Sequence, residues 1–324
     1  MKAIVCPKYG SPEVLEFREV IKPTLKDNQV LVKNYATSLN AADWHIMRGD
    51  PAIYRPVIGL LRPKYKILGA DVAGLVEEVG KNVIQFKPGD EVFGDLSSSG
   101  FGGFAEFVCV NDDALVLKPV TTTFEEAAAV PLAAISALQG LRDSGKIKAG
   151  QKVLINGASG GVGTFAVQIA KSFGTEVTAV CSTGKMEMVR SLGADHIIDY
   201  TKEDFAKNGK QYDLIVAANG NRSILDYRRA LAPTGRYVMI GGSGTQMAQA
   251  IFLGPLISMT SGKKMGNLMA KANQKDLVFL KELLEAGKVK PVIDRCYPLS
   301  QVPEAMRYLE EGHAKGKIVI TMER

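Results

Sequence analysis

The stretch from residue 152 to residue 173 most constrains what this chain can fold into. Residues 152–156 form a short apolar run typical of a buried strand, and they lead directly into the sequence Gly157-Ala158-Ser159-Gly160-Gly161-Val162-Gly163. An amphipathic helix is expected next, because apolar residues recur on one helical face at Val162, Ala166, Ile169, Ala170 and Phe173. A strand, a glycine-rich turn and a helix in this order indicate the start of a dinucleotide-binding βαβ unit.

The glycines of this turn have a physical role. They allow a sharp turn, a close approach of the backbone to a pyrophosphate, and tight packing of the helix on the strand. Gly160, Gly161 and Val162 are therefore expected to bind the cofactor at the helix N-terminus, where unpaired N–H groups and the helix dipole favour phosphate. Ala158 replaces the first glycine of the G-x-G-x-x-G pattern. The structural alternative is a plain glycine-rich loop.

Composition bounds the class of protein. A chain of 324 residues predicts two domains, and the hydrophobic content of 46% with 23% charged residues is ordinary for a globular protein. The net charge of +6 is modest and spread along the chain, so it suits an anionic cofactor and does not indicate nucleic acid.

The same composition argues against a membrane span, an export signal and a local metal motif. No apolar run approaches the ~18 residues of a membrane span, and the N-terminus lacks a signal core, so we expect a cytoplasmic protein with no integral membrane segment. The four cysteines form no C-x-x-C pair and only three histidines are present, so reduced, buried thiols and no zinc motif are expected.

Residues 1–120 read as many short strands separated by turns, which predicts a barrel-like fold. Strands are predicted at 29–33, 72–79, 91–93 and 104–110. A turn into a short helix is expected over 38–49, and residues 50–66, with three prolines, are expected to form a loop.

The pattern changes after residue 124. A buried, alanine-rich helix is predicted over 125–141, kinked or divided at Pro131. From residue 152 strands alternate with helices, which is typical of a doubly wound parallel sheet. The later strands are expected at 176–181, 196–198, 214–217 and 237–240, and helices at 185–192, 223–231 and 276–286. The tail predicts a helix capped by Ser300 and a strand over 317–321.

Several stretches in a fixed order resemble the medium-chain dehydrogenase/reductase superfamily over nearly the whole chain. They are Ser38-Leu39-Asn40 with Asp43 and Arg48-Gly49, Gly69-Ala70-Asp71-Val72-Ala73-Gly74, Phe86-Lys87-Pro88-Gly89-Asp90-Glu91-Val92, Ala128-Ala129-Val130-Pro131, the glycine turn, and Gly312-His313-Ala314-Lys315-Gly316-Lys317. The resemblance implies an α/β protein with a GroES-like β-barrel domain over 1–122, to which 292–324 return, and a Rossmann domain with a doubly wound parallel sheet over 123–291.

Within the superfamily the chain is similar to the zinc-independent quinone oxidoreductases. Zinc alcohol dehydrogenases carry a metal-binding cysteine near the position of Asn40, and Gly-His-Glu where this chain has Gly69-Ala70-Asp71. They often also carry a four-cysteine lobe, which this sequence lacks. The resemblance therefore implies that no residue of the chain is a metal ligand.

The second Rossmann strand ends near Cys181, about 20 residues beyond the glycines, where an Asp or Glu would bind the ribose 2′-OH of NAD. No acid stands there; Ser182 offers a hydrogen bond and Lys185 a positive charge for a 2′-phosphate. These residues predict NADP(H) as the cofactor. The alternative is that Ser182 and Lys185 merely begin the next helix.

Four further positions are assigned to the cofactor. By resemblance, Tyr200 contacts the phosphate, although a surface turn would also suit a tyrosine. Asn219, Gly241 and Gly242 follow strands at the carboxyl edge, where open α/β sheets bind ligands, and ordinary turn chemistry is the alternative.

The remaining candidates lie outside the Rossmann pattern. By resemblance, Asn40 approaches the nicotinamide ribose or the substrate and Lys317 reaches the cofactor; the alternatives are a helix N-cap and a solvated lysine. Tyr54 is the best general-acid candidate, against the alternative of an aromatic in a lid. Asp43 is expected to be structural, orienting its neighbours or capping a helix.

The resulting expectation is an NADPH-dependent reductase that transfers hydride to quinones or α,β-unsaturated carbonyls without a metal. Reduction of a simple ketone leaves an alkoxide, which needs a Lewis acid or a matched acid, whereas a quinone or enone leaves a delocalised anion. A zinc-free alcohol dehydrogenase-like enzyme and an NADPH-binding redox sensor or accessory protein are the alternatives. A homodimer through an exposed edge strand is expected, with residues 252–264 near the interface.

Overall fold

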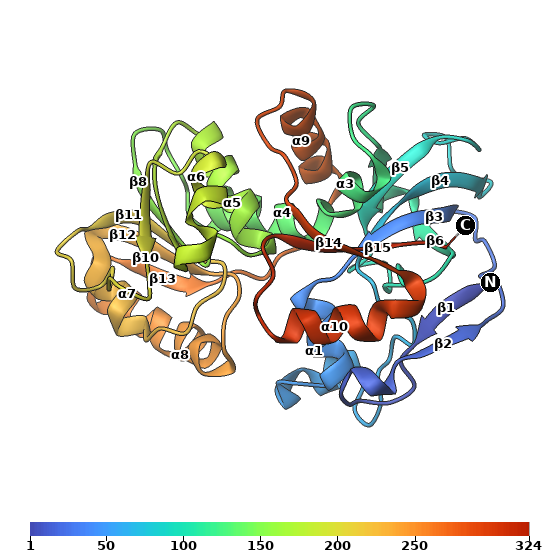
Figure 1. Cartoon of the computed structure of the whole chain (residues 1–324), viewed down its shortest axis with the longest axis horizontal. Coiled ribbons are helices and arrows are strands. Elements are labelled where there is room, and N and C mark those ends of the chain that lie inside the picture. The colour runs from blue at the N-terminus through green and yellow to red at the C-terminus, as the bar shows by residue number, and fades with distance from the viewer. Residues whose placement is uncertain (324) are drawn as a thin grey trace. The chain divides into compact units, whose positions relative to one another are not determined.

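The structure, a computed structural model, describes residues 1–323 and their side chains, that of residue 53 excepted. The chain forms two compact units (Figure 1). The first unit contains residues 1–132, 272–285 and 291–324, and the second contains residues 133–271 and 286–290.

The first unit is built on a seven-stranded sheet. Its strand order is β14-β15-β3-β4-β5-β7, with β6 paired to β3, and β1 and β2 form a separate antiparallel pair. The strands are β1 (Lys2–Val5), β2 (Glu16–Glu19), β3 (Gln29–Ser38), β4 (Asp71–Val79), β5 (Glu91–Asp95), β6 (Phe107–Asn111), β7 (Leu115–Leu117), β14 (Ile293–Pro298) and β15 (Lys317–Thr321).

The last strand returns to the first unit as the sequence predicts. β15 pairs antiparallel with β3, where Val319 faces Ser38, and parallel with β14. The strands bury valines against one another because their side chains alternate between the two faces of the sheet. One core cluster contains Val30, Val32, Val72, Val92 and Val110.

The α-helices of the first unit are α1 (Ala41–Arg48), α2 (Arg55–Ile58), α3 (Phe124–Ala128), α9 (Gln274–Glu285) and α10 (Val302–Glu310). Two of them, α3 and α9, fall in the range that the sequence assigns to the other domain. The expected boundaries at 122/123 and 291/292 differ from those of the structure, because α3 packs on β3 and β4 and α9 packs on β7. The predicted helix over 125–141 is divided at Pro131, where α4 (Pro131–Gln139) begins.

The second unit is a doubly wound sheet of six parallel strands. The order β10-β9-β8-β11-β12-β13 confirms the Rossmann prediction. Its strands are β8 (Lys152–Asn156), β9 (Glu176–Cys181), β10 (His196–Asp199), β11 (Tyr212–Ala217), β12 (Leu231–Met239) and β13 (Lys264–Asn267), and its helices are α5 (Gly161–Ser172), α6 (Met186–Ser191), α7 (Ile224–Ala230) and α8 (Gly244–Thr260).

Two elements of this unit were not predicted. The α8 helix is apolar on most sides and contains Pro255, so its sequence has little helical periodicity. The β13 strand is four residues long and contains Gly266. Strand β12 also begins earlier than predicted, directly after α7.

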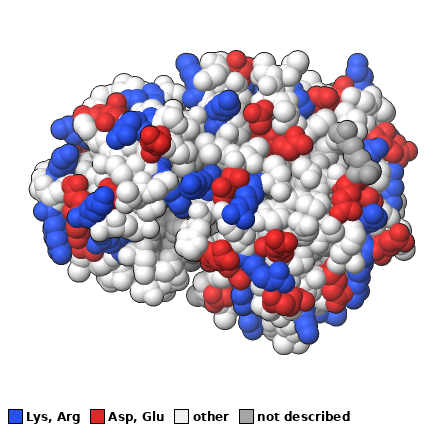
Figure 2. All heavy atoms as spheres, in the orientation of Figure 1, with Lys and Arg blue, Asp and Glu red and all other residues white. Residues whose placement is uncertain are grey.

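The four cysteines differ in burial, and the surface carries charges of both signs. All four cysteines are free; Cys6 and Cys181 are buried, which raises their pKa to about 11, whereas Cys109 is half-buried and Cys296 is exposed. The expectation of buried thiols therefore holds for two of them. Basic and acidic side chains are interspersed over the face in Figure 2. Within residues 1–323 no helix combines the length and apolar character needed to span a bilayer.

Candidate active site

The glycine-rich turn joins β8 to α5 in the second unit. Gly157 has a φ of +79°, and a Cβ on it would collide with the backbone of Asn219, while a Cβ on Gly163 would collide with the carbonyl of Gly157. Gly160 differs, because a Cβ there would meet only the Gly157 oxygen at 3.7 Å. Gly160 is the N-cap of α5. Two glycines are thus required by packing, and the third keeps the helix N-terminus free of side chains.

The ends of β9 and β10 bring three predicted residues together. Ser182 precedes the 3-10 turn that ends at Lys185, and the Tyr200 N–H donates to the Cys181 carbonyl at 3.1 Å. Because β9 and β10 are neighbours in the sheet, all three lie at one end of adjacent strands. Lys185 is half-buried and Tyr200 is exposed.

Asp199, which the sequence analysis did not single out, holds this turn in place. Its carboxylate accepts from the Thr183 hydroxyl and, at 2.7 Å, from the Thr201 hydroxyl. These hydrogen bonds, that of Thr183 first, lower the pKa of Asp199 to about 2. The available signal was the spacing of Asp199 and Thr201, because an Asp side chain commonly accepts from the backbone N–H two residues further on, as Asp199 does at 3.0 Å.

The other predicted residues of the second unit follow β11 and β12. The Asn219 N–H donates to the Asn156 carbonyl at 3.2 Å, and the Gly241 N–H donates to the Ala217 carbonyl at 3.2 Å. Gly242 comes next, with a φ of +151°. Since the strands are parallel, every cofactor residue predicted in this unit lies at the carboxyl end of the sheet.

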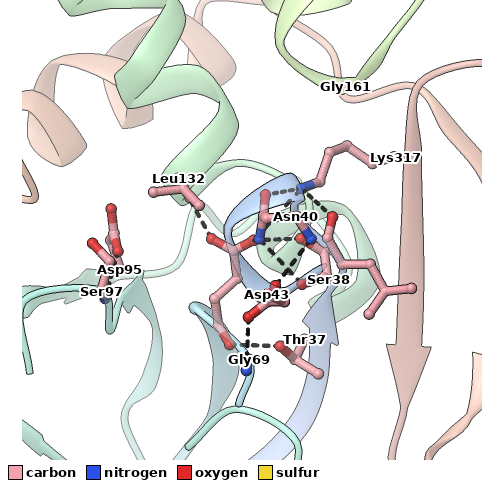
Figure 3. Close-up of polar contacts among 12 residues, drawn as sticks. Thr37, Ser38, Asn40, Asp43, Gly69, Asp95, Ser97, Leu132, Gly161 and Lys317 are labelled. Atoms are coloured by element: carbon pink, nitrogen blue, oxygen red, sulfur yellow. Dashed lines mark hydrogen bonds and ion pairs between the residues drawn. The ribbon is translucent and has the colours of Figure 1, made fainter. Parts of the chain in front are cut away.

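A buried polar cluster occupies the first unit, and we define it as Ser38, Asn40, Asp71 and Lys317 (Figure 3). Lys317 lies on β15 and is 3% exposed. Its Nζ donates to Asn40 Oδ1 at 2.6 Å and to the Leu39 carbonyl at 3.0 Å, and it lies 3.6 Å from Asp71 Oδ2. The cluster joins β3, β4 and β15, so the predicted residues Asn40 and Lys317 are in direct contact.

Asp71 is the centre of this cluster and has no exposed surface. Its Oδ2 accepts from the Asn40 amide at 2.8 Å and from the Ser38 hydroxyl, and its Oδ1 accepts from the Leu132 N–H at 2.8 Å. Burial lowers the pKa of Lys317, and the Asp71 charge acts in the opposite direction. A buried ammonium beside a carboxylate with three further donors is a fully paired arrangement.

Two further buried carboxyls flank the cluster. Asp43 accepts from the Asn40 N–H at 3.0 Å and from the Gly69 N–H at 2.9 Å, and burial raises its pKa to about 7. Asp95 on β5 lies opposite Asp71 on β4 in the antiparallel ladder. Burial first, and then the nearby Asp71 charge, raises the pKa of Asp95 to about 6. The structural role expected of Asp43 is confirmed. Asn40 also occupies the N-cap position of α1, which is the structural role expected as the alternative for it.

The cluster does not fit a zinc ion. By the resemblance described from the sequence, Asn40, Ala70 and Asp71 stand where zinc alcohol dehydrogenases carry metal-binding groups, and these residues supply neither a thiolate nor an imidazole. The Lys317 ammonium already lies beside the one carboxylate of this set. In the described part of the chain, no group of three His, Cys, Asp or Glu side chains is arranged to hold a metal.

Tyr54 lies apart from the Lys317 cluster in sequence and in element. It ends the 3-10 turn Ala52–Tyr54 after α1 and is half-buried. The roles of Ser38, Asp71 and Asp95 were not predicted from the sequence, although Ser38 and Asp71 lie inside the stretches that carried the resemblance. The available signal was an acidic residue at the end of an apolar strand segment, as Asp71 stands before Val72-Ala73 and Asp95 stands after Val92-Phe93-Gly94.

The pairing of Lys317 with Asp71 generates a stability prediction. Lys317→Met or Asp71→Asn alone should lower the free energy of unfolding by about 3–5 kcal/mol, because each leaves the other partner buried without its counterpart. The double variant should lose at least about 1 kcal/mol less than the sum of the two. Urea unfolding measures all three, with Lys207→Met on an exposed ion pair as the control. Strict additivity would show that the two side chains are not coupled.

Asp95 generates a pH prediction. Its pKa in the folded protein is about 6, above the ordinary value of 3.8, so the folded state binds the proton more tightly. The free energy of unfolding should therefore fall between about pH 4 and pH 7, by up to about 3 kcal/mol from this group. Asp95→Asn should flatten that fall in urea unfolding, whereas the exposed Asp113→Asn should not. An unchanged slope in Asp95→Asn would contradict the assignment.

Two family models match separate parts of the chain, and full-length relatives match nearly all of it. Residues 26–120 match the family described as the alcohol dehydrogenase GroES-like domain, and residues 192–320 match the family described as zinc-binding dehydrogenase. A chloroplast envelope quinone oxidoreductase homolog of Arabidopsis thaliana is 37% identical over 99% of this chain and 98% of its own length.

Two other known proteins also match nearly the whole of this chain. A 2-methylene-furan-3-one reductase of Solanum lycopersicum is 37% identical over 99% of this chain and 79% of its own length. The solved structure of the quinone oxidoreductase from Coxiella burnetii is 30% identical and superposes with a TM-score of 0.89, covering 100% of this chain and 99% of that one. The chain therefore belongs to the medium-chain dehydrogenase/reductase superfamily and is quinone oxidoreductase-like within it.

Proposed function

We propose that the protein is an NADPH-dependent reductase that transfers hydride to quinones or α,β-unsaturated carbonyls without a metal. The observation that carries the proposal is the buried Lys317 ammonium, which donates to Asn40 and lies beside Asp71. By the resemblance described from the sequence, these two residues stand where zinc alcohol dehydrogenases bind their metal. Relatives named for the reduction of quinones, of a methylene-furanone and of alkenals support the substrate class.

The chemistry of the acceptor explains why a metal is not required. NADPH, when bound, supplies the hydride. A quinone or enone that accepts hydride becomes a phenolate or enolate, whose negative charge is delocalised. Hydrogen bonds are sufficient to stabilise this anion, and water can then protonate it. A saturated ketone would become an alkoxide, which demands a stronger electrophile.

The residues of the first unit would act by charge and position. The cluster holds one ammonium at a fixed place, and its hydrogen bonds keep that charge from moving. We propose Asn40 and Lys317 for contact with the nicotinamide ribose or with the substrate. Tyr54, which is half-buried on a different segment, is the proposed general acid. It would assist protonation without being indispensable, because water can supply the same proton.

This reading predicts partial, metal-independent activity in a tyrosine variant. NADPH oxidation by quinones or enals should be unaffected by EDTA, and Tyr54→Phe should keep a measurable kcat, lowered by roughly two- to tenfold. Tyr308→Phe, at a half-buried tyrosine of α10 with no proposed role in binding or reaction, is the matched control. Activity lost on chelation would favour a metal-dependent alcohol dehydrogenase, and cofactor binding with no turnover on any acceptor would favour a redox sensor.

The preference for NADPH rests on the end of β9. Ser182 and Lys185 stand there in place of an acid, and Asp199 is bonded to Thr183 and Thr201. A ribose 2′-phosphate would therefore meet a lysine charge and a hydroxyl donor. The main-chain turn around Gly160 would hold the pyrophosphate, with Gly161 and Val162. Tyr200, Asn219, Gly241 and Gly242 complete the proposed cofactor contacts.

Lys185→Ala tests this preference. It should weaken NADPH binding roughly ten- to hundredfold and leave NADH nearly unchanged, since a charged hydrogen bond of about 1.5–3 kcal/mol to the 2′-phosphate is lost. Fluorescence titration with both cofactors measures the effect. Lys202→Ala removes a nearby exposed charge and serves as the control. Equal losses for the two cofactors would mean that Lys185 does not read the 2′-phosphate.

A homodimer through the second unit is the last part of the proposal. The α8 helix exposes Phe252, Leu256 and Met259, and β13 is the edge strand of the sheet. An apolar helix face beside a strand edge is typical of an interface between copies of one chain. Light scattering should give twice the chain mass, and Phe252→Ser with Met259→Ser should give a monomer. A monomeric wild-type protein would remove this part.

A further inference from the structure

A surface loop of the first unit exposes apolar side chains that the hydride chemistry does not use. We call residues 55–66 the apolar loop; it begins with α2 and follows α1 in the blue part of the ribbon (Figure 1). Val57, Leu60 and Leu61 are 72%, 69% and 89% exposed. Three large apolar side chains within five residues form a patch, unlike the isolated exposed Ile84.

The apolar loop is a closed, hydrogen-bonded turn. The Gly59 N–H donates to the Arg55 carbonyl at 2.8 Å, and the Lys64 N–H donates to the Ile58 carbonyl at 2.7 Å. Gly59 has a φ of +122°, and a Cβ there would collide with the Arg62 carbonyl. The backbone therefore fixes the direction of the leucines, and their exposure is a property of the fold.

Anchoring at the base of the loop explains how it stays in this position. The Tyr9 hydroxyl donates to the Gly59 carbonyl, and the Arg55 guanidinium lies 5.1 Å from the centre of the Tyr9 ring. Arg55 Nε also donates to the Gly49 carbonyl at 3.0 Å. The base of the loop is thus tied to the N-terminal segment and to the end of α1.

The charged side chains of residues 51–70 are all basic. Residues 51–70 contain Arg55, Arg62, Lys64 and Lys66 and no Asp or Glu, in a chain that has 40 basic and 34 acidic residues in all. Arg62, Lys64 and Lys66 are exposed. Apolar side chains flanked by cations suit a surface that offers hydrocarbon beneath an anionic layer.

The degree of exposure favours a lipid surface over an acidic protein. A protein partner would have to supply a well-packed pocket that encloses each protruding anchor side chain. Leu60 and Leu61, at 69% and 89% exposure, have few neighbours and protrude. Protruding apolar side chains can enter a bilayer interface without any preformed wall.

We infer that the apolar loop binds the surface of an anionic membrane. Val57, Leu60 and Leu61 enter the interfacial region, and Arg62, Lys64 and Lys66 lie at the level of the lipid headgroups. The association is peripheral and reversible, because it uses three apolar side chains and no spanning helix. It is separate from the proposed function, since it uses none of the residues assigned to the cofactor or to the reaction.

Vesicle cosedimentation of the full-length protein tests this inference. The protein should bind vesicles of phosphatidylglycerol and phosphatidylcholine in equal parts, bind pure phosphatidylcholine far more weakly, and dissociate as salt is raised. Leu60→Ser with Leu61→Ser should weaken binding about tenfold or more, and Arg62→Gln with Lys64→Gln should weaken it and reduce its salt dependence. Thermal melting should be unchanged in both variants, because the altered side chains are exposed.

Matched controls and opposite outcomes make the test decisive. Ile84→Ser removes an exposed apolar side chain outside the loop, and Lys207→Gln removes an exposed charge that is paired with Asp204 in the second unit; neither should alter binding. The inference is overturned if anionic vesicles do not bind, if neutral vesicles bind equally, or if the double serine variant binds as the wild type does. Equal affinity for polyglutamate, lost in the same variants, would assign the loop to an acidic protein surface instead.

Discussion

The contact between the Lys317 ammonium and the Asn40 side chain, 2.6 Å long, is the interaction on which the candidate site of the first unit depends. Lys317 comes from the last strand of the chain and Asn40 from the start of α1, so the contact joins two segments that are far apart in sequence. A buried ammonium is stable only with partners, and Asp71 supplies the countercharge. The return of β15 to the first sheet is therefore what assembles this cluster.

The second unit follows from a different constraint. Six parallel strands direct all their carboxyl ends to one edge, and the residues after each strand must then share that edge. Gly157 and Gly163 are needed for the turn itself, whereas Gly160 leaves the helix N-terminus open. Asp199, through Thr183 and Thr201, fixes the turn that carries Lys185. Geometry and charge at this edge both suit an anionic cofactor.

The sequence predicted the parallel sheet, the return of β15 and the division of the helix at Pro131, because periodicity and proline act locally. It missed α8, whose apolar residues surround the helix and leave no periodic face. It named Asn40 and Lys317 but not the carboxylate that joins them, since the partner of a buried charge is set by tertiary pairing. The same reason explains Asp95, which faces Asp71 only because β4 and β5 pair. The domain boundaries differ from the predicted ones because α3 and α9 pack on strands of the seven-stranded sheet.

The central claim is that the chain reduces conjugated acceptors and does so without a metal. The most direct measurement is a single turnover of metal-depleted protein loaded with NADPH, mixed in a stopped-flow instrument with an enone and, separately, with the saturated ketone of the same carbon skeleton. The account predicts rapid loss of NADPH absorbance with the enone, no loss with the ketone, and no change when zinc is restored. Reduction of the ketone, or activity that appears only with stoichiometric zinc, would contradict it.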